Sequence, residues 1–502
     1  MTEEYIELGI EQLDQDNPEK ALHYFQSAYA LQPDNDEVLF YLGLTHHHLE
    51  RLDEAVRYFR LSLDVNPSSS ETWLNLGNCL DEMNQLEEAE DAYRTASNLD
   101  PENDDVFLEW GNCYYNQERY QEALACYEQA LRINPDNDDA LWDQGDAFVK
   151  LEHYDEAVEV AEALTQRFPD RWQAWYNKAL CCEKLESFDQ VISAARQIIR
   201  LCPDNEDGYE LLGNALFEKE CYDEALQAYD KALELCPSYW SVWASKGNCL
   251  LSLERFEEAL PCFETALADV PDEYAWWNSR GVVLHRLGRD DEALECYRKA
   301  LDLCPDYVLA LSNMADVYMK HRAIDKAEEL YMKAYSIGNR PSDLLSATKC
   351  MYISHRFEEM VQSLLTLLPV AKQEGLDVAY RLGVAYKNLQ QYEEAIRYFK
   401  LQLETSQDGF YSSACWFNIA LCEKELKHLN QAEATLKKAL ELFDSDEEKA
   451  MCHFVLGELY LEREQYRHAL EHLDQAVALD PEIEDYAAAR KVVIRRIKQS
   501  NK

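Results

Sequence analysis

The sequence contains no apolar run that approaches the roughly 18 residues needed to cross a bilayer. Its first residues, MTEEYIELGIEQLDQ, have neither the basic stretch nor the apolar stretch of a secretory signal. These absences predict a cytoplasmic protein without membrane insertion.

Motifs of the common catalytic and cofactor sites are also missing. The sequence has no nucleophile elbow, phosphate loop, dinucleotide fingerprint or H-E-x-x-H pattern. None of its 16 cysteines forms a C-x-x-C pair, the usual zinc or redox spacing. His46, His47 and His48 are consecutive, so on a helix they point in different directions and cannot converge on one ion. We therefore expect no enzyme, no cofactor and no metal.

Basic residues are scarce relative to acidic ones. The chain has 48 Lys and Arg against 96 Asp and Glu, a net charge of −48. Such a surface repels nucleic acid and favours basic protein partners, although acidity that serves solubility alone remains an alternative.

What the sequence does contain is a repeat of 34 residues. Prolines recur at this step at residues 33, 67, 101, 135, 169, 203, 237, 271 and 305. Glycines keep the same step at residues 9, 43, 77, 111, 145, 213, 247 and 281, with Ala179 in the one gap. A fixed period of this length indicates that each unit is one supersecondary module.

Each repeat carries two apolar runs with helical spacing. With repeat one starting at residue 2, the third repeat contains ETWLNLGNCLDEM and LEEAEDAYRTASNL. The proline ends one helix, and the Asn and Asp residues that follow it, as in PDNDD at 135–139, supply caps for the next helix. Glycine at position 8 of the repeat predicts a close approach of the paired helix. The expected fold is all-α.

The consensus of aromatic at position 4, Gly at 8, Ala at 20, aromatic at 24, Ala at 27 and Pro at 32 resembles the tetratricopeptide repeat. Trp243, Gly247, Ala259, Phe263 and Ala266 carry it in repeat eight, which ends with Pro271 at position 32. The resemblance implies a right-handed superhelical solenoid of about 14 helix-turn-helix repeats.

The regularity of the repeats divides the chain into three parts. Residues 1–341 hold ten regular repeats, and residues 342–483 hold a degenerate eleventh repeat, two longer ones near SQDGFYSS and one regular repeat. Residues 484–502 are predicted to form a basic C-terminal capping helix. Lys349 takes the glycine position of the eleventh repeat and predicts a weakened helix crossing there.

The same resemblance implies that the first helix of each repeat lines a concave groove. A row of carboxamides, which both donate and accept hydrogen bonds, can hold an extended peptide backbone, and aromatic side chains can anchor it. The candidate ligand-binding residues are Asn75, Asn78, Leu108, Asn112, Tyr115, Trp142, Asp146, Tyr176, Asn177, Asn214 and Asn248. The alternative is that these side chains only pack within the repeats.

These features predict a non-catalytic scaffold or adaptor that binds other proteins, chiefly basic or extended peptide segments. A regulatory subunit of a separate enzyme would have the same sequence features. An RNA-binding helical-repeat protein would need basic groove positions, and Glu71, Asp105 and Asp139 stand there instead. The sequence leaves the oligomeric state open.

Overall fold

The computed structural model describes residues 1–371, 376–405 and 411–500. Within these ranges every regular element is an α-helix and there is no strand, which confirms the expected all-α class. The chain divides into two compact units, Met1–Arg255 and Phe256–Lys502.

The first unit contains α1 (Thr2–Asp14), α2 (Pro18–Leu31), α3 (Asp36–His48), α4 (Leu52–Val65), α5 (Ser70–Glu82), α6 (Leu86–Leu99), α7 (Asp104–Asn116), α8 (Tyr120–Ile133), α9 (Asp138–Lys150), α10 (Tyr154–Arg167), α11 (Trp172–Lys184), α12 (Phe188–Leu201), α13 (Glu206–Glu218), α14 (Tyr222–Leu235) and α15 (Trp240–Ser252).

The second unit contains α16 (Phe256–Asp269), α17 (Tyr274–Arg286), α18 (Asp290–Leu303), α19 (Val308–Lys320), α20 (Ile324–Gly338), α21 (Pro341–Ile353), α22 (Phe357–Ala371), α23 (Val378–Asn388), α24 (Tyr392–Thr405), α25 (Ser412–Glu425), α26 (Leu429–Leu442), α27 (Asp446–Glu462), α28 (Tyr466–Leu479) and α29 (Glu484–Ser500).

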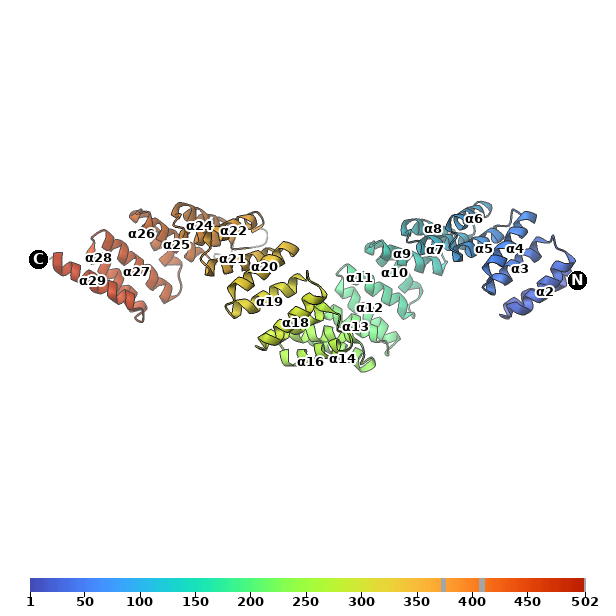
Figure 1. Ribbon diagram of the computed structural model, residues 1–502, viewed down its shortest axis with the longest axis horizontal. Helices are drawn as coiled ribbons and strands as arrows, with labels where there is room; N and C mark the ends of the chain where they lie inside the picture. The colour runs from blue at the N-terminus through green and yellow to red at the C-terminus, as the bar shows by residue number, and fades with distance from the viewer. Residues whose placement is uncertain (372–375, 406–410, 501–502) are drawn as a thin grey trace. The chain divides into compact units, whose positions relative to one another are not determined.

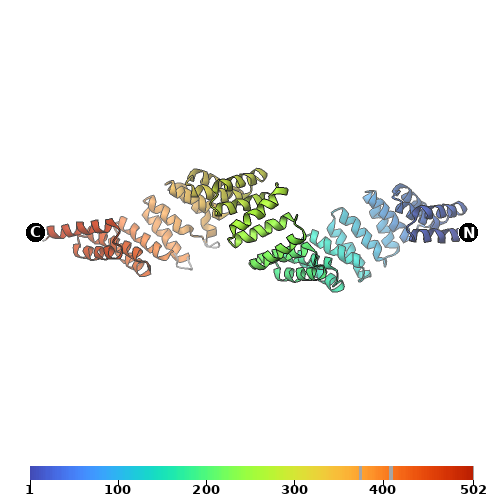
Figure 2. The same ribbon diagram turned by 90° about the horizontal axis from the view of Figure 1, so that it is seen from below.

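Helices that follow one another along the chain pack side by side within each unit (Figure 1, Figure 2). Odd-numbered helices from α1 to α27 are the first helices of the repeats, and even-numbered ones are the second. A residue with positive φ, such as Glu118 at 59°, lies in the turn between the two helices and reverses the chain. The repeat unit is thus a helical hairpin.

A side chain caps the next helix after five of the nine junction prolines, and the capping residue is Asn at four of them and Ser at one. The predicted capping therefore holds for part of the array, and the N-cap residues after the other four prolines make no such bond. The Asn137 side chain accepts a hydrogen bond of 2.9 Å from the backbone N–H of Ala140. Capping side chains occupy the same place at Asn35, Ser69, Asn103 and Asn205. The acidic cluster at 135–139 therefore belongs to a helix start and not to a cation loop.

Glycine at position 8 of the repeat meets a large side chain at position 24. A Cβ atom on Gly111 would lie 2.5 Å from Cε1 of Tyr127, which is closer than any van der Waals contact. The same relation joins Gly9 to Phe25, Gly43 to Phe59, Gly77 to Tyr93 and Gly213 to Tyr229. The predicted close approach is confirmed, with the ring of the second helix as the approaching group.

The eleventh repeat, formed by α21 and α22, is built differently. Lys349 is exposed, whereas Leu345 and Leu364 fill the core of this repeat. The expectation that Lys349 lies at a tight helix crossing is wrong, because its charged end would then be desolvated. The extra residues near SQDGFYSS fall largely on 406–410, outside the described residues.

The C-terminal helix α29 packs on α28. Its buried residues Tyr486 and Val493 cover the apolar side of repeat fourteen, and Lys491 and Arg495 are exposed. A capping role for 484–502 stays a prediction, which this packing fits.

All 16 cysteines are free thiols, and twelve of them are buried. The described part of the chain holds no group of three or more His, Cys, Asp or Glu residues placed to bind a metal ion. Nor is any helix in that part long and apolar enough to pass through a bilayer.

Candidate functional site

A polar hollow of about 320 Å³ lies on the first helices of repeats four and five, α7 and α9. Its walls are Asn112, Tyr115, Asn116, Tyr127, Asp143 and Asp146. Three of the residues predicted from the sequence therefore meet in one place: Asn112, Tyr115 and Asp146.

Three asparagines of the predicted row, Asn78, Asn112 and Asn214, are held by tyrosines of their own repeats. The hydroxyl of Tyr127 donates a hydrogen bond of 2.8 Å to Oδ1 of Asn112. Tyr93 donates in the same way to Asn78, and Tyr229 to Asn214, over 2.9 Å each. The carboxamide oxygen of these residues is thus committed internally. Burial raises the pKa of Glu109, and a hydrogen bond from Nδ2 of Asn112 opposes that rise, so one of the two N–H groups of Asn112 is already used and the other is left at the hollow.

Acidic side chains give the polar hollow its charge. Partial burial, together with the negative charges of Asp146 and Asp139, raises the pKa of Asp143 to about 6. A raised pKa means that the surroundings disfavour the carboxylate, so a cationic group placed beside it would be stabilised. The hollow therefore suits a neutral or basic ligand.

A second hollow, of about 250 Å³, adjoins the first and shares Asp146 with it. It is enclosed by α9, α10 and α11 of repeats five and six. The lining residues are Gly145, Asp146, Val149, Tyr154, Ala157, Val160, Ala161, Leu164, Asn177, Leu180, Cys181, Glu183 and Lys184. We call this hollow the repeat-five cavity. It contains Asn177, a further predicted residue, and its walls are mainly apolar.

Four other residues predicted from the sequence line neither hollow. Asn75 donates its Nδ2 to the backbone carbonyl of Glu71 in its own helix, over 2.8 Å. Leu108 is only 8% exposed and belongs to the core of repeat four. Asn214 and Asn248 line neither hollow.

The two predicted aromatic anchors have neighbours within the protein. Trp142 stacks on Phe168, with 6.2 Å between ring centroids, and Tyr176 meets Trp172 edge to face. For Leu108, Trp142 and Tyr176, packing within the repeats accounts for the side chain without a ligand.

Sequence reasoning missed the residues that create the repeat-five cavity, above all Ala161. The available signal was the aromatic side chain expected at position 24, which repeat five replaces with alanine. Val149 and Leu180 were also missed, and their exposed fractions of 39% and 36% mark them as uncovered apolar side chains.

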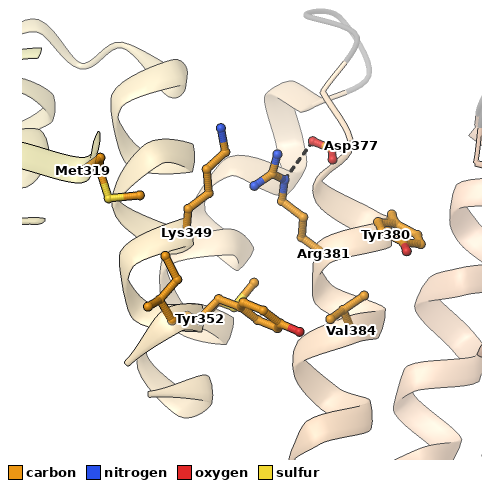
Figure 3. A pocket seen from close by; sticks show the side chains of 9 residues that line it. Met319, Lys349, Tyr352, Asp377, Tyr380, Arg381 and Val384 are labelled. Carbon is orange, nitrogen blue, oxygen red and sulfur yellow. Dashed lines mark hydrogen bonds and ion pairs between the residues drawn. The ribbon is translucent and has the colours of Figure 1, made fainter. Parts of the chain in front are cut away.

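A separate hollow of about 430 Å³ lies in the second unit, beside the irregular eleventh repeat (Figure 3). Met319, Tyr352 and Val384 are among its walls. Lys349 and Arg381 extend to the same side of it, and Arg381 bonds Asp377 over 2.8 Å. This hollow has two cationic side chains and one carboxylate, whereas the charged walls of the polar hollow in the first unit are carboxylates.

Family models described as tetratricopeptide repeat match most of the chain. The matched residues are 6–70, 142–206 and 245–308 for one model, 70–103, 105–137 and 207–239 for a second, and 411–482 and 376–408 for two others. Comparison with curated proteins finds no significant match.

Several solved structures are similar to the chain. The APC/C hetero-tetramer Cut9-Hcn1 is 17% identical, with 97% of this chain and 95% of that chain covered and a TM-score of 0.33. YrrB, described as a TPR protein with an unusual peptide-binding site, is 26% identical over 38% of this chain and 99% of that chain, with a TM-score of 0.35. Naa15/Naa10 bound to HypK-THB is 14% identical over 99% of this chain and 96% of that chain, with a TM-score of 0.37.

Proposed function

Because the chain belongs to the tetratricopeptide repeat family, whose members bind other proteins, we propose that it is a non-catalytic scaffold that holds an extended partner segment against the first helices of its N-terminal unit. The segment is basic or neutral. The polar hollow between α7 and α9 is its central contact.

The observation that carries this proposal is the meeting of Asn112, Tyr115, Asp143 and Asp146 in one hollow. The Nδ2 group of Asn112 is oriented by the bond from Tyr127 and shared with the Glu109 carboxylate, and its second N–H can donate to a backbone carbonyl without a further loss of side-chain freedom. The two carboxylates attract Lys or Arg side chains of the segment.

The charge of this hollow argues against RNA as the ligand. Phosphate binding requires cations, and Asp143 and Asp146 would repel a phosphodiester backbone. A protein segment, whose charge varies with sequence, is the better match.

Affinity capture with a charge-matched control tests the proposal. The full chain is compared with the double variant Asp143→Asn, Asp146→Asn, and bound proteins from a native lysate are identified by mass spectrometry at low and high salt. The control is Glu156→Gln, Glu159→Gln, which removes the same charge from exposed positions of α10 outside both hollows.

We expect proteins captured by the wild type to be lost by the groove variant, retained by the control variant and weakened by salt. A captured peptide segment should then bind the isolated full chain in calorimetry. Equal capture by both variants, with folding intact, would show that this hollow is not the binding site.

A further inference from the structure

Repeat five lacks a side chain that the other glycine-containing repeats possess. Every other repeat with glycine at position 8 has Phe, Tyr or Leu sixteen residues later, whereas Gly145 is followed by Ala161. In repeat four the Tyr127 ring lies 2.5 Å from a Cβ built on Gly111. On Gly145 the nearest atom is Cγ1 of Val160, at 3.2 Å.

The missing ring leaves the repeat-five cavity. Gly111 is buried under Tyr127, but Gly145 is partly accessible. The helices α9 and α10 also pack less closely than α7 and α8 do. The cavity is about 250 Å³, and a cavity of roughly 150 Å³ is known to hold a benzene ring. The space therefore has the size of the side chain that the repeat does not supply.

The cavity has an apolar floor. Ala157, Ala161 and Leu164 are at most 2% exposed. Burial raises the pKa of the Cys181 thiol to about 11, so this wall is neutral at physiological pH. A floor of this kind accepts a ring without a polar substituent at its far end.

The mouth of the cavity is polar and acidic at its edges. Asp146 is exposed there, and α11 adds Asn177, Glu183 and one cation, Lys184, which lies beside Glu183. Val149 and Leu180 flank the opening with exposed apolar surface. Asp146 also lines the polar hollow, so a segment held in that hollow passes the mouth of the cavity.

We propose that the repeat-five cavity receives the phenylalanine side chain of a bound basic segment. The segment thereby provides the ring that is missing where Ala161 replaces an aromatic residue. The inference deepens the proposed function and rests on it. The ring enters from the mouth, and the acidic edge pairs with Lys or Arg residues beside the phenylalanine.

Direction of entry distinguishes phenylalanine from tyrosine. In the intact repeats the ring grows from the second helix and its hydroxyl points to position 9, as Tyr127 does to Asn112. A side chain that enters from the groove points its para position at the floor instead. A tyrosine hydroxyl would then be buried among Ala157, Ala161 and Leu164 without a partner, which is costly.

The test uses three capped tripeptides, Lys-Phe-Lys, Lys-Tyr-Lys and Lys-Ala-Lys, titrated into the full chain by ligand-observed NMR. We expect the Phe peptide to bind roughly 10-fold or more tightly than the Ala peptide, because a benzyl group is buried. It should bind roughly 5-fold or more tightly than the Tyr peptide, because the hydroxyl is left unpaired.

Two variants fill the cavity from within. Ala161→Tyr restores the ring of repeats three and four, and Ala161→Leu places there the residue that repeat fourteen has at Leu473. Either folded variant should lose the preference for the Phe peptide, while the weak binding of the Ala peptide stays. If Ala161→Tyr does not fold, the same measurement is made on Ala161→Leu.

A wild type that binds the Phe and Ala peptides equally would overturn the inference, as would a filled variant that keeps the preference. Equal binding of the Phe and Tyr peptides would overturn the assignment to a phenylalanine ring. These results leave the capture experiment on Asp143 and Asp146 untouched, so failure of the cavity proposal is distinguishable from failure of the groove proposal.

Discussion

The hydroxyl of Tyr127 on α8 donates to Oδ1 of Asn112 on α7, 2.8 Å away, and thereby joins the inner packing of repeat four to its groove surface. The ring of this tyrosine excludes a side chain at Gly111, and its hydroxyl orients the Asn112 amide at the polar hollow. One residue therefore serves both the stability of the repeat and the orientation of a candidate binding group.

Removing this hydroxyl should cost stability and affinity together. Tyr127→Phe is expected to lower the free energy of unfolding by about 0.5–1.5 kcal/mol, the net contribution of one hydrogen bond. Denaturant unfolding, monitored by circular dichroism, measures this change in the free energy of unfolding. Tyr297→Phe is the matched control, because Val282 stands at the carboxamide position of that repeat and the control should change little. Equal losses in the two variants would contradict the prediction.

The glycines of adjacent repeats should respond oppositely to the same substitution. Gly111→Ala places a methyl group 2.5 Å from the Tyr127 ring and should destabilise by about 1–3 kcal/mol. Gly145→Ala places it 3.2 Å from Val160, beside the cavity, and alanine is a better helix former by about 1 kcal/mol. We expect a neutral or stabilising effect there. Thermal unfolding of both variants measures the two effects. A large loss of stability in Gly145→Ala would mean that the cavity is not open.

The substitution Asn112→Asp, at position 9 of repeat four, tests whether the Nδ2 donor of Asn112 contributes to binding. In repeat ten Tyr331 donates to Asp316, so Asn112→Asp keeps an acceptor for Tyr127 and removes the Nδ2 donor. We expect some loss of stability, because the new carboxylate lies beside that of Glu109, and a fall in the affinity for a captured segment of about 0.5–1.5 kcal/mol. Calorimetry at high salt makes the measurement, since screening suppresses attraction to the added charge. Unchanged affinity would show that Asn112 serves only packing.

The stability of the chain should depend on the protonation of Asp143. Its pKa is about 6 in the folded chain against 3.8 for the free side chain, so between these values the folded state holds a proton that the unfolded state has released. The contribution of this group to stability therefore falls as the pH rises from about 4 to 6 and remains low above 6. Asp143→Asn should stabilise the chain above pH 6, with an effect that shrinks toward pH 4.

Melting temperatures of wild type and Asp143→Asn across this pH range test the sign. Asp155→Asn, at an exposed position of α10, controls for the loss of one charge. A stabilisation that is the same at pH 4 and pH 7 would contradict the assignment of the raised pKa to Asp143.

Much of the fold was predictable because the repeat makes local signals redundant. The caps at Asn137 and the close approach at Gly111 follow from rules that hold within a few residues or one helix pair. Lys349 was misplaced, because α21 begins one residue earlier than the 34-residue step predicts, so that the buried Thr348 takes the glycine position instead.

The candidate site was less predictable for a different reason. Asn112, Tyr115 and Asp146 could be named from their positions, but the roles of Trp142 and Tyr176 depend on contacts with Phe168 and Trp172 that periodicity does not reveal. The cavity exists because residue 161 is alanine and has no aromatic ring. A small residue at an aromatic position can be compensated by a neighbour. Val160 fills part of the space beside Gly145, and only the three-dimensional arrangement shows that a hollow remains.

The repeat-five cavity also bears on how the N-terminal unit unfolds. In a linear array each repeat is stabilised by its two neighbours, so cooperativity passes along the chain one interface at a time. The loosely packed helix pair α9–α10 makes repeat five a weak unit in that series. A ring bound there would add contacts to all three helices at once, and the repeats before and after it would melt as one cooperative block instead of two.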